Sequence, residues 1–119
     1  MKTVINLPLK DEALLLTVTR GVEVVDMNTI VRIEASSNYS KIYFANGQKL
    51  VSSKVLRWFE EHLPDQLFVR IHRTHIVNKK FIRTYIYNSG KIALANGESI
   101  QVSRRKKEVF LKCWHNAAA

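Results

Sequence analysis

The stretch Phe68-Val-Arg-Ile-His-Arg-Thr-His-Ile-Val-Asn78 decides how we expect this chain to fold. At its start, Arg70 and His72 alternate with Val69 and Ile71. Successive side chains of a strand point to opposite faces, so the alternation predicts a strand with one apolar and one polar face. The apolar face can be buried in a core while Arg70 and His72 share the opposite side with Phe68.

The alternation stops at Arg73 and Thr74, where we expect a connection. Thr74 suits the N-cap position of a short helical turn through residues 76–78, because its hydroxyl can accept a backbone N–H. Arg73 and His75 then lie on or beside an exposed segment. Asn78 is interpreted as structural, since asparagine closes turns through side chain-to-backbone hydrogen bonds.

The net charge of +9 is confined to the second half of the chain. Residues 1–69 hold eight Lys/Arg and eight Asp/Glu, whereas residues 70–119 hold eleven Lys/Arg and two Asp/Glu. Between Arg70 and Arg83 there are five basic residues and no acid. Like charges this close repel one another unless a polyanion neutralises them, so the pattern predicts a surface for nucleic acid or another polyanion.

The rest of the chain is typical of strands joined by tight turns. Arg20-Gly21 supplies the first turn, and Ser36-Ser-Asn38 and Asn88-Ser-Gly90 supply two more. Asn46-Gly47 and Asn96-Gly97 are strong hairpin signals, because a type I′ turn needs positive φ at both central residues. The expected strands are residues 13–19, 22–26, 30–35, 40–45, 48–52, 81–87, 91–95 and 98–102.

Two short helices are predicted, each after a serine that can cap it. Ser53 precedes a helix over residues 54–62, which ends before Pro64, and Ser103 precedes a helix that starts at Arg104. Apolar residues recur at helical spacing in both. They are Val55, Leu56, Phe59 and Leu63 in the first helix, and Val109, Phe110, Cys113 and Trp114 in the second.

The second helix begins with Arg104-Arg105-Lys106-Lys107, which carries the unfavourable sign of charge for a helix N-terminus. The helix dipole is positive there, and each cation costs roughly a few tenths of a kcal/mol. A solvated basic turn is one explanation. Contact with phosphate groups, which backbone N–H groups at a helix start also favour, is the explanation that agrees with the basic stretch from residue 70 to residue 83.

A segment of the first half is repeated in the second. Lys41-Ile-x-x-Ala-Asn-Gly-x-x-Leu-x-x-Ser-Lys54 returns as Lys91-Ile-x-x-Ala-Asn-Gly-x-x-Ile-x-x-Ser-Arg104. Two copies are too few for a solenoid, which needs about three. Either one supersecondary structure is used twice, or both strand-to-helix corners present a cation to the same ligand.

Three segments together resemble the LytTR family, the DNA-binding output domain of many bacterial response regulators. They are Ile33-Glu-Ala-x-x-Asn38-Tyr39, Phe68-x-Arg-Ile-His-Arg-Thr-x-Ile-Val-Asn78 and Val102-Ser-Arg-Arg-Lys-Lys107, in the family's order. The resemblance covers about residues 12–115. It implies a mostly β fold with two short helices, an elongated β-β-β sandwich of small antiparallel sheets. It also implies that loops, rather than a recognition helix, enter the major groove of DNA.

The resemblance assigns roles to particular residues. It implies that DNA is read by the loop before Lys41, the turn after the strand that ends at His72, and the basic residue after the last hairpin. Bidentate contact with guanine is expected from arginine, and phosphate contacts set register without reading sequence. We therefore assign base contacts to Arg73 and Arg104, base or phosphate contacts to Asn38, Ser40 and His72, and phosphate contacts to Lys41, Arg70, Lys79, Arg105 and Lys107. The family often has a longer or charged side chain where this chain has Ser40.

The expected organisation is a linker or leading strand at residues 1–11, one DNA-binding domain at residues 12–116 and a tail or cloning remnant at residues 117–119. The expected partner is double-stranded DNA with repeated sites, with a possible dimer on DNA. A sensor kinase acts upstream only if the full-length protein carries a receiver domain. A lone cysteine, Cys113, fits a reducing cytoplasm, and no apolar run is long enough for a membrane span or a signal peptide.

Other interpretations were weighed against this one. His72-x-x-His75 is half of a metal site at most, since structural zinc needs about four ligands, so neither metal nor cofactor is expected. Stacking of tyrosines on bases would make the chain a single-stranded DNA- or RNA-binding module of the OB type, but Tyr43 and Tyr87 are expected in the core or in cross-strand pairs. No catalytic motif is present, so an enzyme is not expected.

Overall fold

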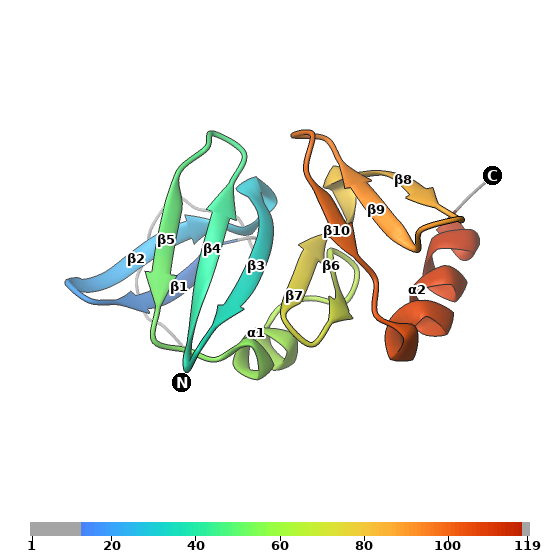
Figure 1. Cartoon of the computed structure of the whole chain (residues 1–119). Helices are drawn as coiled ribbons and strands as arrows, with labels where there is room; N and C mark the ends of the chain where they lie inside the picture. The colour runs from blue at the N-terminus through green and yellow to red at the C-terminus, as the bar shows by residue number, and fades with distance from the viewer. Residues whose placement is uncertain (1–12, 118–119) are drawn as a thin grey trace.

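The computed structural model describes residues 13–117. The predicted linker at residues 1–11 and the last two residues of the predicted tail lie outside this range. Across the described residues the chain forms ten strands in three antiparallel sheets, with two α-helices and two short 3-10 turns (Figure 1). The mostly β fold with two helices and small packed sheets is confirmed.

The first sheet is the predicted hairpin of β1 (Ala13–Val18) and β2 (Gly21–Asp26). Its turn is Thr19-Arg20, one residue earlier than predicted, since Gly21 already pairs with Val18. A 3-10 turn at Met27–Thr29 follows, capped by Asp26, whose carboxylate accepts the backbone N–H of Asn28 at 2.9 Å. This turn redirects the chain from the hairpin into the central sheet.

The central sheet has five strands in the order β5-β4-β3-β7-β6. Its members are β3 (Ile30–Ser36), β4 (Tyr39–Phe44), β5 (Lys49–Ser52), β6 (Phe68–His72) and β7 (His75–Asn78). The turn between β4 and β5 is at Asn46-Gly47, as predicted. Of these two residues only Gly47 takes a positive φ, +89°, so the type I′ conformation expected from the sequence, which needs positive φ at both, is not formed.

The prediction of a helical turn at residues 76–78 is wrong, because these residues belong to β7. Arg73 and Thr74 form a tight turn, and the chain returns antiparallel along β6. Ile76 and Val77 also pair with β3 on their other side. Two neighbouring strands thus satisfy the backbone groups that a helical turn would have paired locally, and β-branched side chains suit that environment.

The third sheet has the order β10-β9-β8, with β8 (Ile82–Ile86), β9 (Lys91–Leu94) and β10 (Ser99–Gln101). A second 3-10 turn at Lys79–Phe81 leads into β8. As predicted, Asn78 is structural and fully buried: its Oδ1 accepts the N–H of Lys80 at 3.0 Å, and its Nδ2 donates to the carbonyl of Ile30 at 2.9 Å.

The helices begin where their capping groups allow. α1 (Leu56–His62) starts two residues later than predicted, and among the described residues no side chain caps its first turn, so the assignment of Ser53 as a cap is wrong. Val55 is 47% exposed and lies outside the helix. α2 (Arg104–Ala117) starts as predicted, with Ser103 Oγ accepting the N–H of Lys106 at 3.2 Å.

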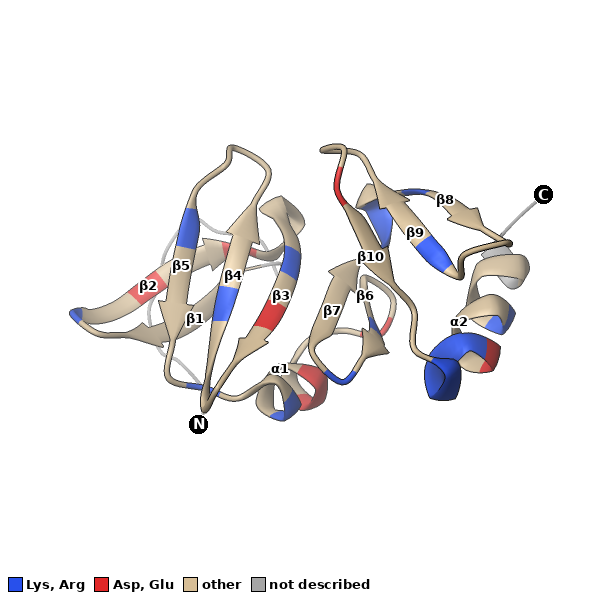
Figure 2. Cartoon of the chain, in the orientation of Figure 1, with Lys and Arg blue, Asp and Glu red and all other residues tan. Residues whose placement is uncertain are grey.

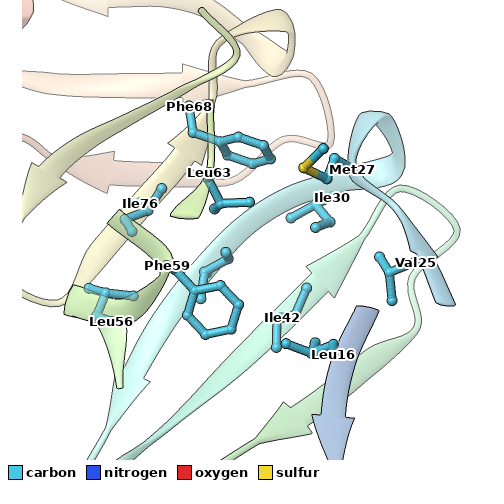
Figure 3. Packing of buried hydrophobic residues seen from close by; sticks show 11 residues of the cluster. Leu16, Val25, Met27, Ile30, Ile42, Leu56, Phe59, Leu63, Phe68 and Ile76 are labelled. Carbon is cyan, nitrogen blue, oxygen red and sulfur yellow. The ribbon is translucent and has the colours of Figure 1, made fainter. Parts of the chain in front are cut away.

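Two apolar cores lie on opposite faces of the shared central sheet. One is covered by the β1–β2 hairpin and α1 (Figure 3), and the other by the third sheet and α2. The neighbouring residues Ile76 and Val77 point into different cores, as alternation along a strand requires. Of the apolar residues predicted for α2, Phe110 is 2% exposed but Val109 is 64% exposed.

The repeat seen in the sequence is a repeat of structure. β3-β4-β5-α1 and β8-β9-β10-α2 have the same order of elements. In both units the pairing of the first two strands shifts register near its start, after Ile30 in one and after Ile82 in the other. In both, the alanine before the Asn-Gly turn donates to the 3-10 turn that precedes the unit, Ala45 to Thr29 at 2.9 Å and Ala95 to Phe81 at 2.8 Å.

Candidate nucleic-acid interface

Three connections gather along one end of the molecule, the lower edge in Figure 1: the β3–β4 turn, the β6–β7 turn and the corner between β10 and α2. Basic residues of the β6–β7 turn and of the first turn of α2 lie along this edge (Figure 2). These are the three places that the sequence analysis named. The fold therefore brings together segments that are about thirty residues apart from one to the next.

The β6–β7 turn presents Arg73, whose side chain is exposed. Its backbone is held by Arg70, which donates Nε to the carbonyl of His72 at 3.1 Å and an Nη to the carbonyl of Arg73 at 2.6 Å. The other Nη of Arg70 forms an ion pair with Glu60 of α1 at 2.7 Å. Arg70, assigned to phosphate contact, thus has its guanidinium occupied within the protein.

The corner before α2 is attached to the same strand. The pairing of β6 with β7 shifts register between Arg70 and His72, so Ile71 is left out of the regular ladder. The carbonyl of Ile71 instead accepts the N–H of Ser103 at 2.8 Å. Arg104 follows Ser103 directly and is exposed, so the bulge in β6 connects the segments that carry Arg73 and Arg104. Arg105 and Lys107 are exposed as well.

The β3–β4 turn differs from its prediction at one residue. Asn38 is exposed, and Ser37 takes a positive φ of 59° to make the turn. Ser40 is fully buried, and its hydroxyl donates to the carbonyl of Lys54 at 2.7 Å. This hydroxyl is therefore not presented to a ligand, and the assignment of Ser40 to DNA contact is corrected. Lys41, half-buried, lies opposite Glu34 on the neighbouring strand.

Lys79 is not brought to this end. It begins the 3-10 turn at the far end of β7 from Arg73, and its ammonium group donates to the carbonyl of Asp65 at 2.7 Å. The basic residues between 70 and 83 therefore lie at two different ends of β7, with Arg73 before the strand and Lys79 after it. Sequence proximity alone had joined residues that the fold separates.

The side chains of His72 and His75 both contact the hydroxyl of Thr74. The Thr74 hydroxyl lies 2.8 Å from Nδ1 of His72 and 3.0 Å from Nδ1 of His75. His75 is half-buried and hydrogen-bonded, and burial, followed by the nearby Arg32 charge, lowers its pKa. Within residues 13–117 no group of three or more His, Cys, Asp or Glu side chains could hold a metal ion.

The sequence analysis missed a charged cluster behind this turn. Arg32 is 8% exposed, forms a fork with Glu98 (2.8 and 3.1 Å), pairs with Glu34 at 2.9 Å and stacks 3.9 Å from the ring centre of Tyr43. The same guanidinium lies 3.4 Å from Nε2 of His75. The cluster joins the central sheet to the third sheet. Arg32 between Val31 and Ile33 signals a buried charge, and Glu34 lies only two residues away, but Glu98 is too distant in sequence to be identified as a partner.

The acids of this cluster are held in their charged form. Hydrogen bonding to Arg32 is the main cause of the lowered pKa of Glu98. Burial raises the pKa of Glu34, but hydrogen bonding and attraction to Arg32 outweigh it, so its pKa is also lowered. Burial likewise opposes the charge of Arg32, and the two acids still raise its pKa.

The tyrosines divide between core and surface. Tyr43 is half-buried beneath Arg32, as expected for a residue packed on the sheet. Tyr87, expected in the core or in a cross-strand pair, is 72% exposed and contacts Tyr85 edge to face with ring centres 5.5 Å apart. That prediction is wrong because Tyr87 follows the last residue of β8 and enters the turn.

No helix in the described part of the chain is long and apolar enough to cross a membrane.

Comparison with known proteins adds evidence of a different kind. The family model for the LytTr DNA-binding domain matches residues 20–115. Sensory transduction protein LytR of Staphylococcus epidermidis is 27% identical over 99 residues, which are 78% of this chain and 38% of that protein. A solved LytTr DNA-binding domain from Bacillus cereus superposes with a TM-score of 0.75 and 24% identity, over 87% of this chain and 96% of that one. The chain spans about two fifths of the length of the curated relative, and the structural likeness concerns the fold.

Proposed function

Because this chain belongs to the LytTr DNA-binding domain family, the DNA-binding domains of two-component response regulators that control transcription, we propose that it binds double-stranded DNA sequence-specifically. In this proposal the β6–β7 turn and the corner before α2 enter the major groove. That groove is about 12 Å wide, which admits a tight turn of the chain.

The observation that carries the proposal is the pairing of two exposed arginines on segments that are hydrogen-bonded to each other. Arg73 follows β6 by one residue, Arg104 follows Ser103, and Ser103 donates to the carbonyl of Ile71 within β6. A fixed relation between the two backbone segments lets their arginines reach two bases in one register, because each guanidinium can contact guanine O6 and N7 together.

The other cations of this edge are assigned to phosphates. Arg105 and Lys107 are exposed in the first turn of α2, and Lys41 is the third residue of β4. Asn38, an uncharged residue of the β3–β4 turn, is assigned to a base or phosphate contact. His72, half-buried and bonded to Thr74, supports the turn from within. Contacts of this kind set the position of the protein on DNA and make affinity fall steeply with salt.

The wider biological setting follows from the family. We infer a cytoplasmic transcriptional regulator that binds repeated sites, with two copies of the domain side by side on DNA. A single small module binds modestly, and two linked contacts multiply affinity. A sensor kinase acts upstream where a receiver domain accompanies this domain, whose proposed limits are residues 12–116.

The test is selection from a random duplex library at physiological salt, with single-stranded DNA as competitor. We expect enrichment of a duplex motif that occurs in repeats. Enrichment of single strands without any duplex motif would contradict the proposal and would favour a single-strand or RNA surface.

A further inference from the structure

We propose that Arg70 is a positioning residue, which holds the β6–β7 turn in the shape that presents Arg73 and does not itself contact DNA. This inference rests on the proposed function and deepens it. It replaces the assignment of Arg70 to phosphate contact with a role inside the protein.

The guanidinium of Arg70 makes three hydrogen bonds within the protein. Its three nitrogens bind three separate acceptors: Nε the carbonyl of His72, one Nη the carbonyl of Arg73, and the other Nη the carboxylate of Glu60. Two of these acceptors, the carbonyl groups of His72 and Arg73, belong to the two consecutive peptide bonds that flank the Cα atom of Arg73. Fixing both carbonyls fixes the direction in which the Arg73 side chain leaves the turn.

The turn needs this support because the strand pairing that leads into it is interrupted. The register shift between Arg70 and His72 interrupts the ladder of β6 with β7 just before the turn. Backbone groups beside a bulge lose their regular strand partners, and polar groups that are partly shielded from water need replacements. Arg70 supplies two donors at the place where the strand pairing is interrupted.

Arg70 and Arg73 also differ in how their charges are paired. The Arg70 side chain is 19% exposed, and its charge is paired with Glu60 of α1, which is 42% exposed. Arg73, by contrast, is exposed and forms no ion pair with any described residue. A paired, mostly covered cation attracts phosphate less than a free one, so the two arginines of this segment have different tasks.

Lysine cannot replace arginine in this role. The guanidinium is planar and presents five N–H donors in a rigid fork, whereas an ammonium is a compact point charge on a flexible stem. Arg70→Lys therefore separates the two explanations, because it keeps the charge and removes the fork. Arg57→Lys in α1 is the matched control, since Arg57 is 82% exposed and pairs with Glu61 on the outer face of the helix.

The experiment measures the Kd of each variant for the selected duplex and for a scrambled duplex of equal length, at several salt concentrations. We expect Arg70→Lys to weaken specific binding about tenfold or more, to leave scrambled binding within about twofold, and to leave the salt slope unchanged. Combined with Arg73→Ala, it should add little, because residues that act as a unit are non-additive. If Arg70 is a phosphate contact, Arg70→Lys retains affinity and Arg70→Met weakens both duplexes and lowers the slope by about 1.

Glu60→Gln is an independent test, because the two explanations of Arg70 predict opposite changes in DNA affinity. Removal of an acid near DNA raises affinity for every duplex if Arg70 is freed to meet phosphate. If Glu60 anchors the positioning residue, the same change lowers specific affinity. Glu60 is on the surface of α1, so this variant is expected to fold, which circular dichroism and thermal melting would check.

The positioning role of Arg70 can be tested even if the chain does not bind DNA. If the wild-type chain selects no duplex, amide hydrogen exchange in the free protein tests the positioning role alone. Exchange at Thr74, whose N–H donates to Nδ1 of His72 at 3.2 Å, should be at least several-fold faster in Arg70→Lys than in wild type and unchanged in Arg57→Lys. Equal exchange in all three proteins would overturn the inference.

Discussion

Residues 30–62 and residues 82–117 each form three antiparallel strands followed by a helix. Their Asn-Gly turns are closed by equivalent bonds, Gln48 N–H to Asn46 Oδ1 at 2.9 Å and Glu98 N–H to Asn96 Oδ1 at 3.0 Å. The strand-to-helix corners nevertheless differ. Lys54 is half-buried with its ammonium 5.6 Å from the Trp58 ring centre, whereas Arg104 is exposed. The same backbone plan therefore serves the core in one unit and the candidate interface in the other.

The difference teaches that the repeated pattern encodes folding and that function depends on the side chains added to it. α1 has seven residues, one of which is basic in its first turn, whereas α2 has 14 residues and begins with four basic residues. Those basic residues oppose the helix dipole, so the second unit gives up more stability than the first.

The largest expected effect tests whether the two cores are equivalent. Phe59 in one and Phe110 in the other are 0% and 2% exposed. Phe59→Ala and Phe110→Ala should each lower the free energy of unfolding by about 3–5 kcal/mol, because each removes a large buried ring. Urea unfolding followed by circular dichroism measures this. A loss below about 1 kcal/mol for one variant alone would show that its core contributes little.

The next effect compares the two corners in DNA binding. Arg104→Ala should cost about 1–3 kcal/mol at the selected duplex and relax its sequence preference, as expected for an arginine that contacts a base. Lys54→Ala, at the equivalent position, should cost less, because its ammonium already rests on Trp58. Equal losses in the same binding titrations would instead favour the second interpretation of the repeat, in which both corners contact the same ligand.

A smaller effect compares the two serines before the helices. Ser103→Ala should lower the free energy of unfolding by about 1 kcal/mol, because its hydroxyl caps the first turn of α2. Ser53→Ala should change it by less than about 0.5 kcal/mol, as is usual for a surface substitution away from a cap. Thermal unfolding of both variants measures the contrast, and equal destabilisation would argue against the capping role.

The smallest effect concerns the cluster that joins the two units. Burial lowers the pKa of His75 below its ordinary value of 6.5, and the groups that face it are Arg32, Glu34, His72 and Glu98. A lowered folded-state pKa stabilises the protein above the unfolded pKa, and this contribution is lost as pH falls towards the folded value. Stability should therefore decline below about pH 6.5, and His75→Gln should remove that decline.

The same cluster predicts a second decline at lower pH. The pKa values of Glu34 and Glu98 are lowered from their ordinary value of 4.5 by Arg32, so their contribution is present above that pH and is lost below it. Urea unfolding at a series of pH values should show both steps in the wild type. A flat profile between pH 7 and pH 5 would contradict the proposed effect of His75.

Much of the fold could be predicted because its signals are local. Both Asn-Gly hairpins, the first hairpin and the cap at Ser103 depend on residues a few positions apart. The error at residues 76–78 has the opposite origin. Thr74 has the chemistry of a helix cap, but pairing with β3, more than forty residues earlier in the chain, outweighs that local preference.

The candidate interface divides in the same way. The motif led us to predict Arg73 and Arg104 as base contacts, and both side chains are exposed. It could not separate Ser40, Lys79 and Arg70 from them, because their bonds go to Lys54, Asp65 and Glu60. Whether a polar side chain is free for a ligand depends on partners that spacing does not reveal.

The sequence by itself determined the strand and helix types except at residues 76–78, the positions of most turns, the basic second half and the family of this chain. Periodicity, turn chemistry and net charge are properties of neighbouring residues, so they can be read without coordinates. Only the tertiary structure decided which cations share an edge, which are occupied within the protein, and how Ile71 and Ser103 link Arg73 to Arg104. The physical reason is that buried polar groups find partners across the fold, and those partners are set by packing rather than by distance along the chain.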